Sequence, residues 1–162
     1  MADHDVILLA EDNETDVLFL RRAFEKVHLI NPLHVVGDGE EAIAYLSGEG
    51  KYANRAEYPL PALLLLDLKM PHKNGLEVLQ WIRAQPSLRC LRVVVLTTSE
   101  LYRDVNKAYE LGANSYLVKP VEFENFVRIS QMLQGYWLWM SMAPQISRPA
   151  PSEQREPGKA QV

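Results

Sequence analysis

The chain has 162 residues, of which 48% are apolar and 23% are charged, a composition typical of one globular domain with a tail. Its formal net charge of -4 argues against a nucleic-acid partner, because such surfaces need clustered lysine and arginine. The single cysteine excludes an intrachain disulfide and is typical of a reducing compartment. The chain begins without the basic segment of a signal peptide, and it has no run of the ~20 apolar residues that span a bilayer. We therefore expect a cytoplasmic protein without a membrane partner.

Five short apolar runs have the length of strands, and each is followed by a segment whose apolar residues recur at helical spacing. In chain order, the runs predicted as strands are residues 6–10, 33–36, 62–66, 91–96 and 115–118. The segments predicted as helices are residues 17–27, 42–46, 76–82, 101–108 and about 122–142. Asn13 is placed to cap the first helix, and Gly112 to end the fourth. This alternation predicts an α/β fold with a parallel sheet and helices on both of its faces.

Two segments fall outside this alternation. Residues 47–61 are rich in glycine, proline and polar side chains, which predicts a long loop before the third strand. Residues 143–162 are polar and proline-rich, which predicts a disordered tail. A single domain over residues 5–142 is therefore expected, and the short tail leaves no room for a DNA-binding output module.

Polar residues follow four of the predicted strands at the point where each strand ends. They are Glu11 and Asp12, Asp67, Thr97, and Lys119. Because ligands of open parallel sheets bind at the carboxyl ends of the strands, these side chains are expected to converge there. Clustered carboxylates favour a hard divalent cation such as Mg²⁺, and a carboxylate can attack phosphorus to form an aspartyl phosphate. A lysine and a hydroxyl would then bind the phosphoryl oxygens.

The same residues lie in four motifs that together resemble the response regulator receiver family. The motifs are Glu11-Asp12, LLLLDLKMP around Asp67, LTTS around Thr97 and YLVKP around Lys119. No single motif is specific, but all four in this order and at strand ends are. The resemblance covers residues 5–142 and implies a flavodoxin-like (receiver) fold, whose five-stranded parallel sheet has the order 2-1-3-4-5.

The resemblance also implies a role for each site residue. Asp67 would be the phospho-acceptor, while Thr97 and Lys119 would hold the phosphoryl oxygens. Mg²⁺ would be the cofactor. Its ligands would be Asp12, Asp67, the backbone carbonyl of Lys69 and, through water, Glu11. Tyr116 matches the family's switch aromatic, which moves inward when the hydroxyl residue corresponding to Thr97 shifts toward the phosphate.

A narrower resemblance links the chain to single-domain response regulators that partner bacterial phytochrome histidine kinases. It rests on the first helix (NETDVLFLRRAFEKV), the long loop before the third strand, the LTTS segment and the aromatic C-terminal helix. Several members of that group are homodimers. In the last predicted helix, Phe123, Leu133 and Trp137 have the spacing of a core-facing stripe. Other apolar residues are left on the remaining faces: Tyr136, Leu138, Trp139 and Met142. They predict a homodimer contact through the C-terminal region.

We therefore expect a single-domain response regulator, and not an enzyme with a substrate of its own. A sensor histidine kinase, with the phytochrome type as the candidate, would phosphorylate Asp67. The signal would then pass through phosphorylation-dependent protein contacts. The chemistry of the domain itself would be Mg²⁺-dependent self-phosphorylation and self-dephosphorylation.

Four other interpretations are open. An aspartate-based phosphatase would use Asp67 as a transient nucleophile, but such enzymes need a second acid two residues later, where this chain has Lys69. A degenerate receiver that only binds a partner lacks the acceptor or the lysine, and this chain has both. A flavin-binding module of the same fold class would be yellow on purification. Residues 37–42 match the dinucleotide pattern G-x-G-x-x-A, but three acids occupy the place of the pyrophosphate, so a turn and a helix start are expected there.

Overall fold

The computed structural model describes residues 5–140, 142, 144 and 146, and within them strands and helices alternate. The strands are β1 (Ile7–Ala10), β2 (Leu33–Val36), β3 (Leu63–Leu66), β4 (Val93–Thr97) and β5 (Ser115–Val118). The helices are α1 (Glu14–Lys26), α2 (Gly39–Ser47), α3 (Gly75–Ala84), α4 (Tyr102–Glu110) and α5 (Phe123–Met132). No helix of this part of the chain is long and apolar enough to cross a membrane. Apart from residues 144 and 146, the predicted tail lies outside the described residues.

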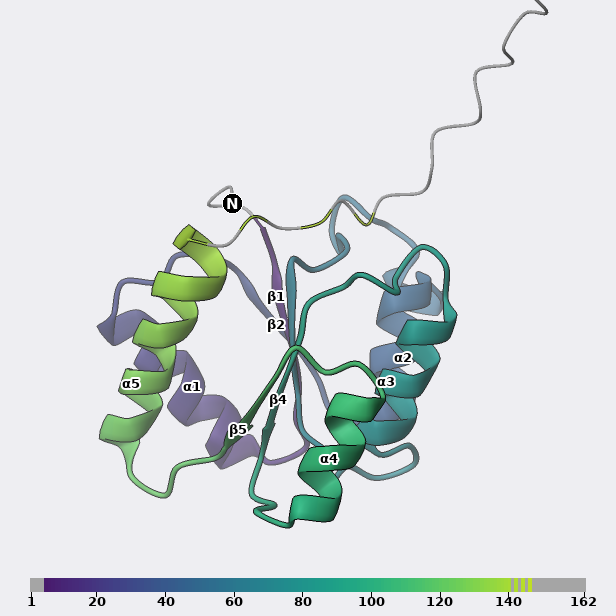
Figure 1. Cartoon of the computed structure of the whole chain (residues 1–162). Coiled ribbons are helices and arrows are strands. Elements are labelled where there is room, and N and C mark those ends of the chain that lie inside the picture. Colours follow the sequence, from purple (N-terminus) through teal and green to yellow (C-terminus); the bar gives the residue numbers. More distant parts are fainter. Residues whose placement is uncertain (1–4, 141, 143, 145, 147–162) are drawn as a thin grey trace, which may run out of the picture.

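The strands form one parallel sheet in the order β2-β1-β3-β4-β5, which confirms the predicted fold. Helices α1 and α5 cover one face, and α2, α3 and α4 cover the other (Figure 1). β3 lies at the centre of the sheet, and its four leucines are fully buried. A strand that is apolar at every position is stable only where both faces are covered, which explains why this segment takes the central place.

Alternate residues of β3 belong to two separate cores. Leu64 and Leu66 pack with α2, α3 and α4, whereas Leu63 and Leu65 pack with α1 and α5. This follows from the strand period of two, which sends successive side chains to opposite faces of the sheet. The two cores hold the helices against the sheet and so fix where the loops at the strand ends lie.

Three helices begin with a side-chain cap. Asn13, Asp38 and Asn74 each accept a hydrogen bond from the backbone N–H three residues later. Such caps stabilise a helix by about 1 kcal/mol each. The cap at Asp38 shows that residues 37–42 are a turn and a helix start, as predicted. Because these helices follow β1, β2 and the loop after β3, their caps fix the chain at one edge of the sheet.

The C-terminal helix changes its winding after α5. Residues Leu133–Met140 continue it as a π-helix, and Met142, which the predicted helix included, is not helical. Leu133 is buried in the core shared by α1 and α5, and Trp137 packs against that core. Arg92 donates to the carbonyl oxygen of Trp137 at 2.9 Å, and its guanidinium lies 5.5 Å from the centre of the indole ring. These contacts tie the last helical turns to the start of β4.

The long loop before β3 is packed against the domain. Arg55 donates to the carbonyl oxygens of Tyr45, Leu46 and Tyr58 at 2.7, 2.8 and 3.1 Å. The rings of Tyr45, Tyr52 and Tyr58 meet with centroids 5.0 to 5.9 Å apart. A short 3-10 helix, Gly50–Tyr52, brings Tyr52 into this cluster. The polar composition predicted a loop, but its aromatic residues make the loop a packed part of the domain.

Candidate functional site

The predicted site residues lie at one edge of the sheet. Glu11 follows β1, Asp67 follows β3, Thr97 ends β4 and Lys119 follows β5. Parallel pairing aligns these strand ends. The N–H of Asp67 donates to the carbonyl oxygen of Ala10 at 3.0 Å, and that of Lys119 donates to the carbonyl oxygen of Thr97 at 2.7 Å. The expected convergence of these residues is therefore present.

The ammonium group of Lys119 is the centre of the site. Only 5% of this side chain is exposed, and its Nζ atom contacts three carboxylates. The distances are 2.6 Å to Oε2 of Glu11, 2.9 Å to Oδ2 of Asp16 and 2.9 Å to Oδ2 of Asp67. An ammonium has three N–H donors, so each donor can serve one carboxylate. Burying these charges is tolerable because they are paired and hydrogen-bonded.

Burial and the hydrogen bonds within the cluster shift the pKa values of Glu11 and Lys119. Burial raises the pKa of Glu11 to about 7, because hydrogen bonds from Lys119 and the backbone of Asn13 offset only part of the desolvation. Burial alone would lower the pKa of Lys119, but its hydrogen bonds to the three carboxylates outweigh this and raise the pKa. Lys119 is therefore protonated at neutral pH, and the surrounding acids favour additional positive charge.

Three acids at this edge form a group that could hold a metal ion. Glu11, Asp12 and Asp67 each offer one carboxylate oxygen, and these atoms lie within 4.8 Å of one another. Asp12 is exposed, whereas Glu11 and Asp67 are buried. The backbone N–H of Lys69 donates to Oδ1 of Asp67 at 3.3 Å, so this residue lies beside the acid group. An all-oxygen set suits a hard divalent cation. The ligand role of the Lys69 carbonyl stays a prediction.

The hydroxyl of Thr97 is an unsatisfied group in the same region. Thr97 is fully buried, and its Oγ1 atom has no hydrogen-bond partner among the described residues. A buried polar group left unpaired costs about 1–3 kcal/mol, so a ligand that accepts its hydrogen bond would be stabilised. Thr97 ends β4, which pairs with the strand that leads to Asp67. The hydroxyl is thus suited to bind an oxygen-rich group at this edge.

Tyr116 of β5 is tied to the loop that follows Thr97. Its ring is half-buried against the core that contains α2, α3 and α4. Its hydroxyl donates to the carbonyl oxygen of Ser99 at 2.9 Å. The hydroxyl of Ser99 in turn donates to Oδ2 of Asp104 at 2.5 Å. A shift of the loop between β4 and α4 would therefore change the environment of Tyr116.

The backbone behind Asp67 is closely packed against the start of α3. A Cβ atom on Gly75 would lie 2.2 Å from the carbonyl oxygen of Asp67, so only glycine fits there. The N–H of Gly75 donates to the carbonyl oxygen of Leu68 at 2.9 Å. The turn after β3 is thus held directly against the backbone of the candidate acceptor.

Asp16 is a site residue that the sequence analysis did not identify. It lies in the first turn of α1 and contacts Lys119 across 103 positions of the sequence. One signal was available, because Asp16 stands three residues after the cap Asn13, in a helix that begins at the strand ends. An acid there also has an ordinary explanation, since acids favour the first turn of any helix.

Fold and site together define a class of protein. A family model described as the response regulator receiver domain matches residues 7–131, which is most of the chain and includes every site residue named above. The chain belongs to this family of signalling domains.

Several members of this family are similar to the chain over most of their length. Response regulator Rcp1 of Synechocystis sp. is 38% identical over 133 residues, which cover 82% of this chain and 88% of that protein. Its Mn²⁺-bound structure superposes with a TM-score of 0.79 at 37% identity, covering 86% of this chain and 99% of that one. The phosphorylated cyanobacterial phytochrome response regulator RcpA superposes with a TM-score of 0.81 at 37% identity, covering 87% and 99%. The probable methanogenesis regulatory protein FilR2 of Methanothrix harundinacea is 38% identical over 145 residues, covering 88% and 89%. The chain is therefore related to phytochrome response regulators.

Proposed function

We propose that Asp67 accepts a phosphoryl group and that the domain signals in its phosphorylated form. The contact between Lys119 and Asp67 carries this proposal, because it places a buried ammonium 2.9 Å from a buried carboxylate at the ends of two different strands. In the reaction an oxygen of Asp67 bonds to phosphorus, the bond from phosphorus to the donor breaks, and the leaving group departs with the electron pair. The structure of phosphorylated RcpA, a relative, supports the proposal.

The same residues fit Mg²⁺ as the cofactor. Asp12 and Asp67 would bind the ion directly, and Glu11 would bind it through water. The backbone carbonyl of Lys69 would complete the protein ligands. When bound, Mg²⁺ supplies positive charge to the phosphoryl oxygens. The three neighbouring carboxylates of Glu11, Asp12 and Asp67 and the Mn²⁺-bound form of Rcp1 support the assignment.

Thr97, Lys119 and Tyr116 complete the proposed mechanism. Lys119 holds one phosphoryl oxygen in place of its contact with Asp67, and the unpaired hydroxyl of Thr97 donates to another. Movement of Thr97 toward the phosphate pulls the loop that contains Ser99. The hydrogen bond from Tyr116 to Ser99 then breaks, and the ring turns inward. Partners read this change at the surface of β5 and α4.

The phosphoryl donor is proposed to be a sensor histidine kinase of the phytochrome type. The names of the relatives support this choice, since RcpA is described as a phytochrome response regulator. FilR2, which is as similar to this chain as Rcp1 is, has a name that refers to methanogenesis. The histidine kinase therefore follows from the family as a whole, and the phytochrome type from a subset of the relatives.

Incubation with acetyl phosphate and Mg²⁺ tests the proposed reaction. Intact mass spectrometry is expected to show one phosphoryl group per chain with Mg²⁺ and none with EDTA, because the phosphoryl charge is then not neutralised. The adduct should be lost slowly on its own, by self-dephosphorylation. A rapid loss could hide it, so binding of fluoroberyllate, a stable phosphoryl mimic, is measured in parallel. A chain that shows neither an adduct nor fluoroberyllate binding would contradict the proposal.

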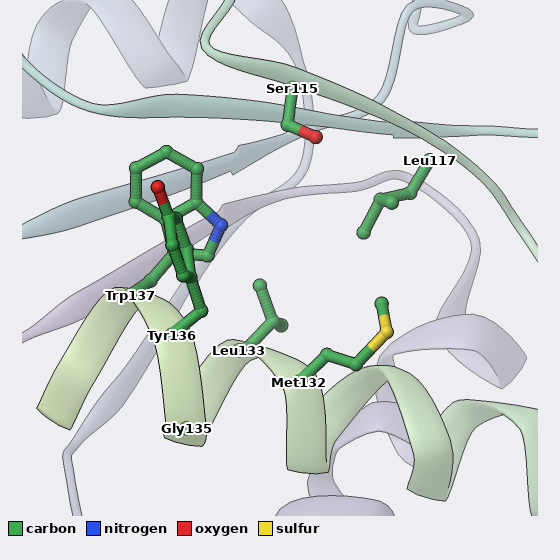
Figure 2. Close-up of a pocket in the computed structure, with 7 residues that line it drawn as sticks. All are labelled: Ser115, Leu117, Met132, Leu133, Gly135, Tyr136 and Trp137. Carbon is green, nitrogen blue, oxygen red and sulfur yellow. The ribbon is translucent and has the colours of Figure 1, made fainter. Parts of the chain in front are cut away.

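A homodimer through the C-terminal region is part of the proposed function. A cavity of about 370 Å³ lies between β5 and the C-terminal helix. Figure 2 shows Ser115 and Leu117 of β5 facing the helix across this cavity, with Tyr136 and Trp137 at one end. Met132 and Tyr136 are 54% and 61% exposed, although apolar and aromatic. β5 is also an edge strand of the sheet. Apolar surface of this kind often marks an interface.

The substitution Tyr136→Arg is expected to weaken the dimer at least tenfold, because it places a charge in an apolar contact. Analytical ultracentrifugation of the wild type and the variant, with and without fluoroberyllate, measures the effect. Ile30→Arg is the matched control. Ile30 is 68% exposed and lies just before β2, which is the outermost strand on the side of the sheet away from β5. A wild type that sediments as a monomer at micromolar concentration in both states would contradict the dimer.

A further inference from the structure

The carboxylate of Asp16 contacts Lys119 but stands apart from the acids that could hold a metal. Its Oδ2 atom lies 2.9 Å from Nζ of Lys119. Among the described residues, the group able to hold a metal consists of Glu11, Asp12 and Asp67, and Asp16 is not in it. Of the three carboxylates around Lys119, that of Asp16 is therefore the one with no share in the proposed metal site.

The helix α1 determines where this carboxylate lies. The backbone N–H of Asp16 donates to Oδ1 of the cap residue Asn13 at 3.1 Å. Further along α1, Leu20 and Phe24 are buried in the core shared with α5. The side chain of Asp16 is 25% exposed, compared with 5% for Asp67. Asp16 therefore reaches the ammonium group from the more exposed side of the site, on a helix that packing holds in place.

This arrangement separates the carboxylates that would bind the cation and the phosphoryl group from the carboxylate that holds Lys119. A cation and a phosphoryl group would both engage Asp67, and the cation would also draw on Glu11, so these two carboxylates change partners during the reaction. Asp16 has no part in either exchange and would keep its contact with Lys119. Nζ of Lys119 would then stay in place while its hydrogen bond to Asp67 is exchanged for one to a phosphoryl oxygen.

We propose that Asp16 is a positioning residue, which holds the ammonium group of Lys119 where the phosphoryl oxygens will lie. The inference rests on the proposed phosphorylation of Asp67. It assigns a task to an acid of α1 that neither binds the cation nor accepts the phosphoryl group. Because the hydrogen bond is the proposed link, any side chain with an acceptor oxygen at this position should retain most of the effect.

The test compares phosphorylation rates of four proteins with acetyl phosphate and Mg²⁺. Asp16→Ala is expected to be phosphorylated about tenfold more slowly than the wild type, because a misplaced ammonium group of Lys119 binds the transition state less well. Asp16→Asn retains an acceptor oxygen and is expected to stay within about threefold of the wild type. Glu14→Ala is the matched control and should equal the wild type. It removes the same charge from the same helical turn, and Glu14 is exposed.

A second measurement does not depend on phosphorylation. The ¹⁵N ammonium signal of Lys119 is expected to be resolved in the wild type and in Asp16→Asn, because three hydrogen bonds slow the exchange of its protons. In Asp16→Ala the signal should broaden. Mg²⁺ affinity, measured by calorimetry, should be close to that of the wild type in Asp16→Ala, because Asp16 is not among the acids that could hold the ion.

The outcomes separate this inference from the proposed function. A wild type that takes up no phosphoryl group and binds no fluoroberyllate would overturn both. A wild type that is labelled, with Asp16→Ala labelled at the rate of Glu14→Ala, would overturn the role of Asp16 alone. A fall in Mg²⁺ affinity that matches the fall in rate would also overturn it, because Asp16 would then act through the metal.

Discussion

The variant Asp67→Asn is expected to take up no phosphoryl group from acetyl phosphate under conditions that fully label the wild type. An amide oxygen is a far weaker nucleophile toward phosphorus than a carboxylate oxygen, and the substitution would also remove one charge from the proposed cation site. Intact mass spectrometry after incubation with Mg²⁺ measures the result. The fold should survive, because the variant removes a buried negative charge from a cluster that already has an excess of acids.

Asp38→Asn is the matched control for this variant. It makes the same chemical change at the same edge of the sheet, in a residue that caps α2 and pairs with His72. Asparagine caps helices as well as aspartate does, so this control should be labelled like the wild type. Thermal unfolding of both variants separates a loss of reactivity from a loss of structure. Labelling of Asp67→Asn to the same extent as the control would show that another residue is the acceptor.

The variant Lys119→Met is expected to lose about 3 kcal/mol of folding free energy in the absence of divalent cations, because removing one partner of a buried ion cluster leaves unpaired buried charges. Methionine has nearly the length of lysine, so the change is mainly one of charge. Three carboxylates now contact the ammonium group, and all three would lose this partner. The variant should also be phosphorylated far more slowly than the wild type.

Addition of Mg²⁺ should restore part of the stability of Lys119→Met. A ligand that binds only the folded state stabilises it, and the acids without Lys119 should bind a divalent cation more tightly. Urea unfolding at fixed Mg²⁺ concentrations measures both effects. Lys73→Met is the matched control, because Lys73 is an exposed lysine in the loop after β3. If the two variants unfold at the same urea concentration without Mg²⁺, the ammonium group does not stabilise the cluster.

The positions of the strands and helices could be predicted from the sequence because each depends on a pattern of neighbouring residues. The run Leu63–Leu66 is apolar at every position, which identifies a strand buried on both faces and hence the centre of the sheet. Asn13 was expected to cap the first helix and does so, and residues 37–42, expected to form a turn and a helix start, begin α2 at the cap residue Asp38. Asp67 could be singled out because it follows the central strand directly.

Contacts between distant segments could not be predicted in the same way. Asp16 contacts Lys119 only because the packing of α1 and the register of β5 bring their side chains to one point, and no local pattern encodes that geometry. The same holds for the cluster of Tyr45, Tyr52 and Tyr58, which makes the polar loop before β3 a packed segment. The unpaired hydroxyl of Thr97 is also a tertiary property, since it depends on which groups surround the buried end of β4.

The sequence by itself thus determined the order of the elements, the family and the residues at the strand ends. These follow from the period of apolar residues, from turn chemistry and from motifs, all of which act over a few neighbouring positions. Only the tertiary structure decided that Lys119 divides its three donors among Glu11, Asp16 and Asp67. A buried ammonium group takes whichever acceptors the packed backbone brings within about 3 Å, and packing depends on the whole chain.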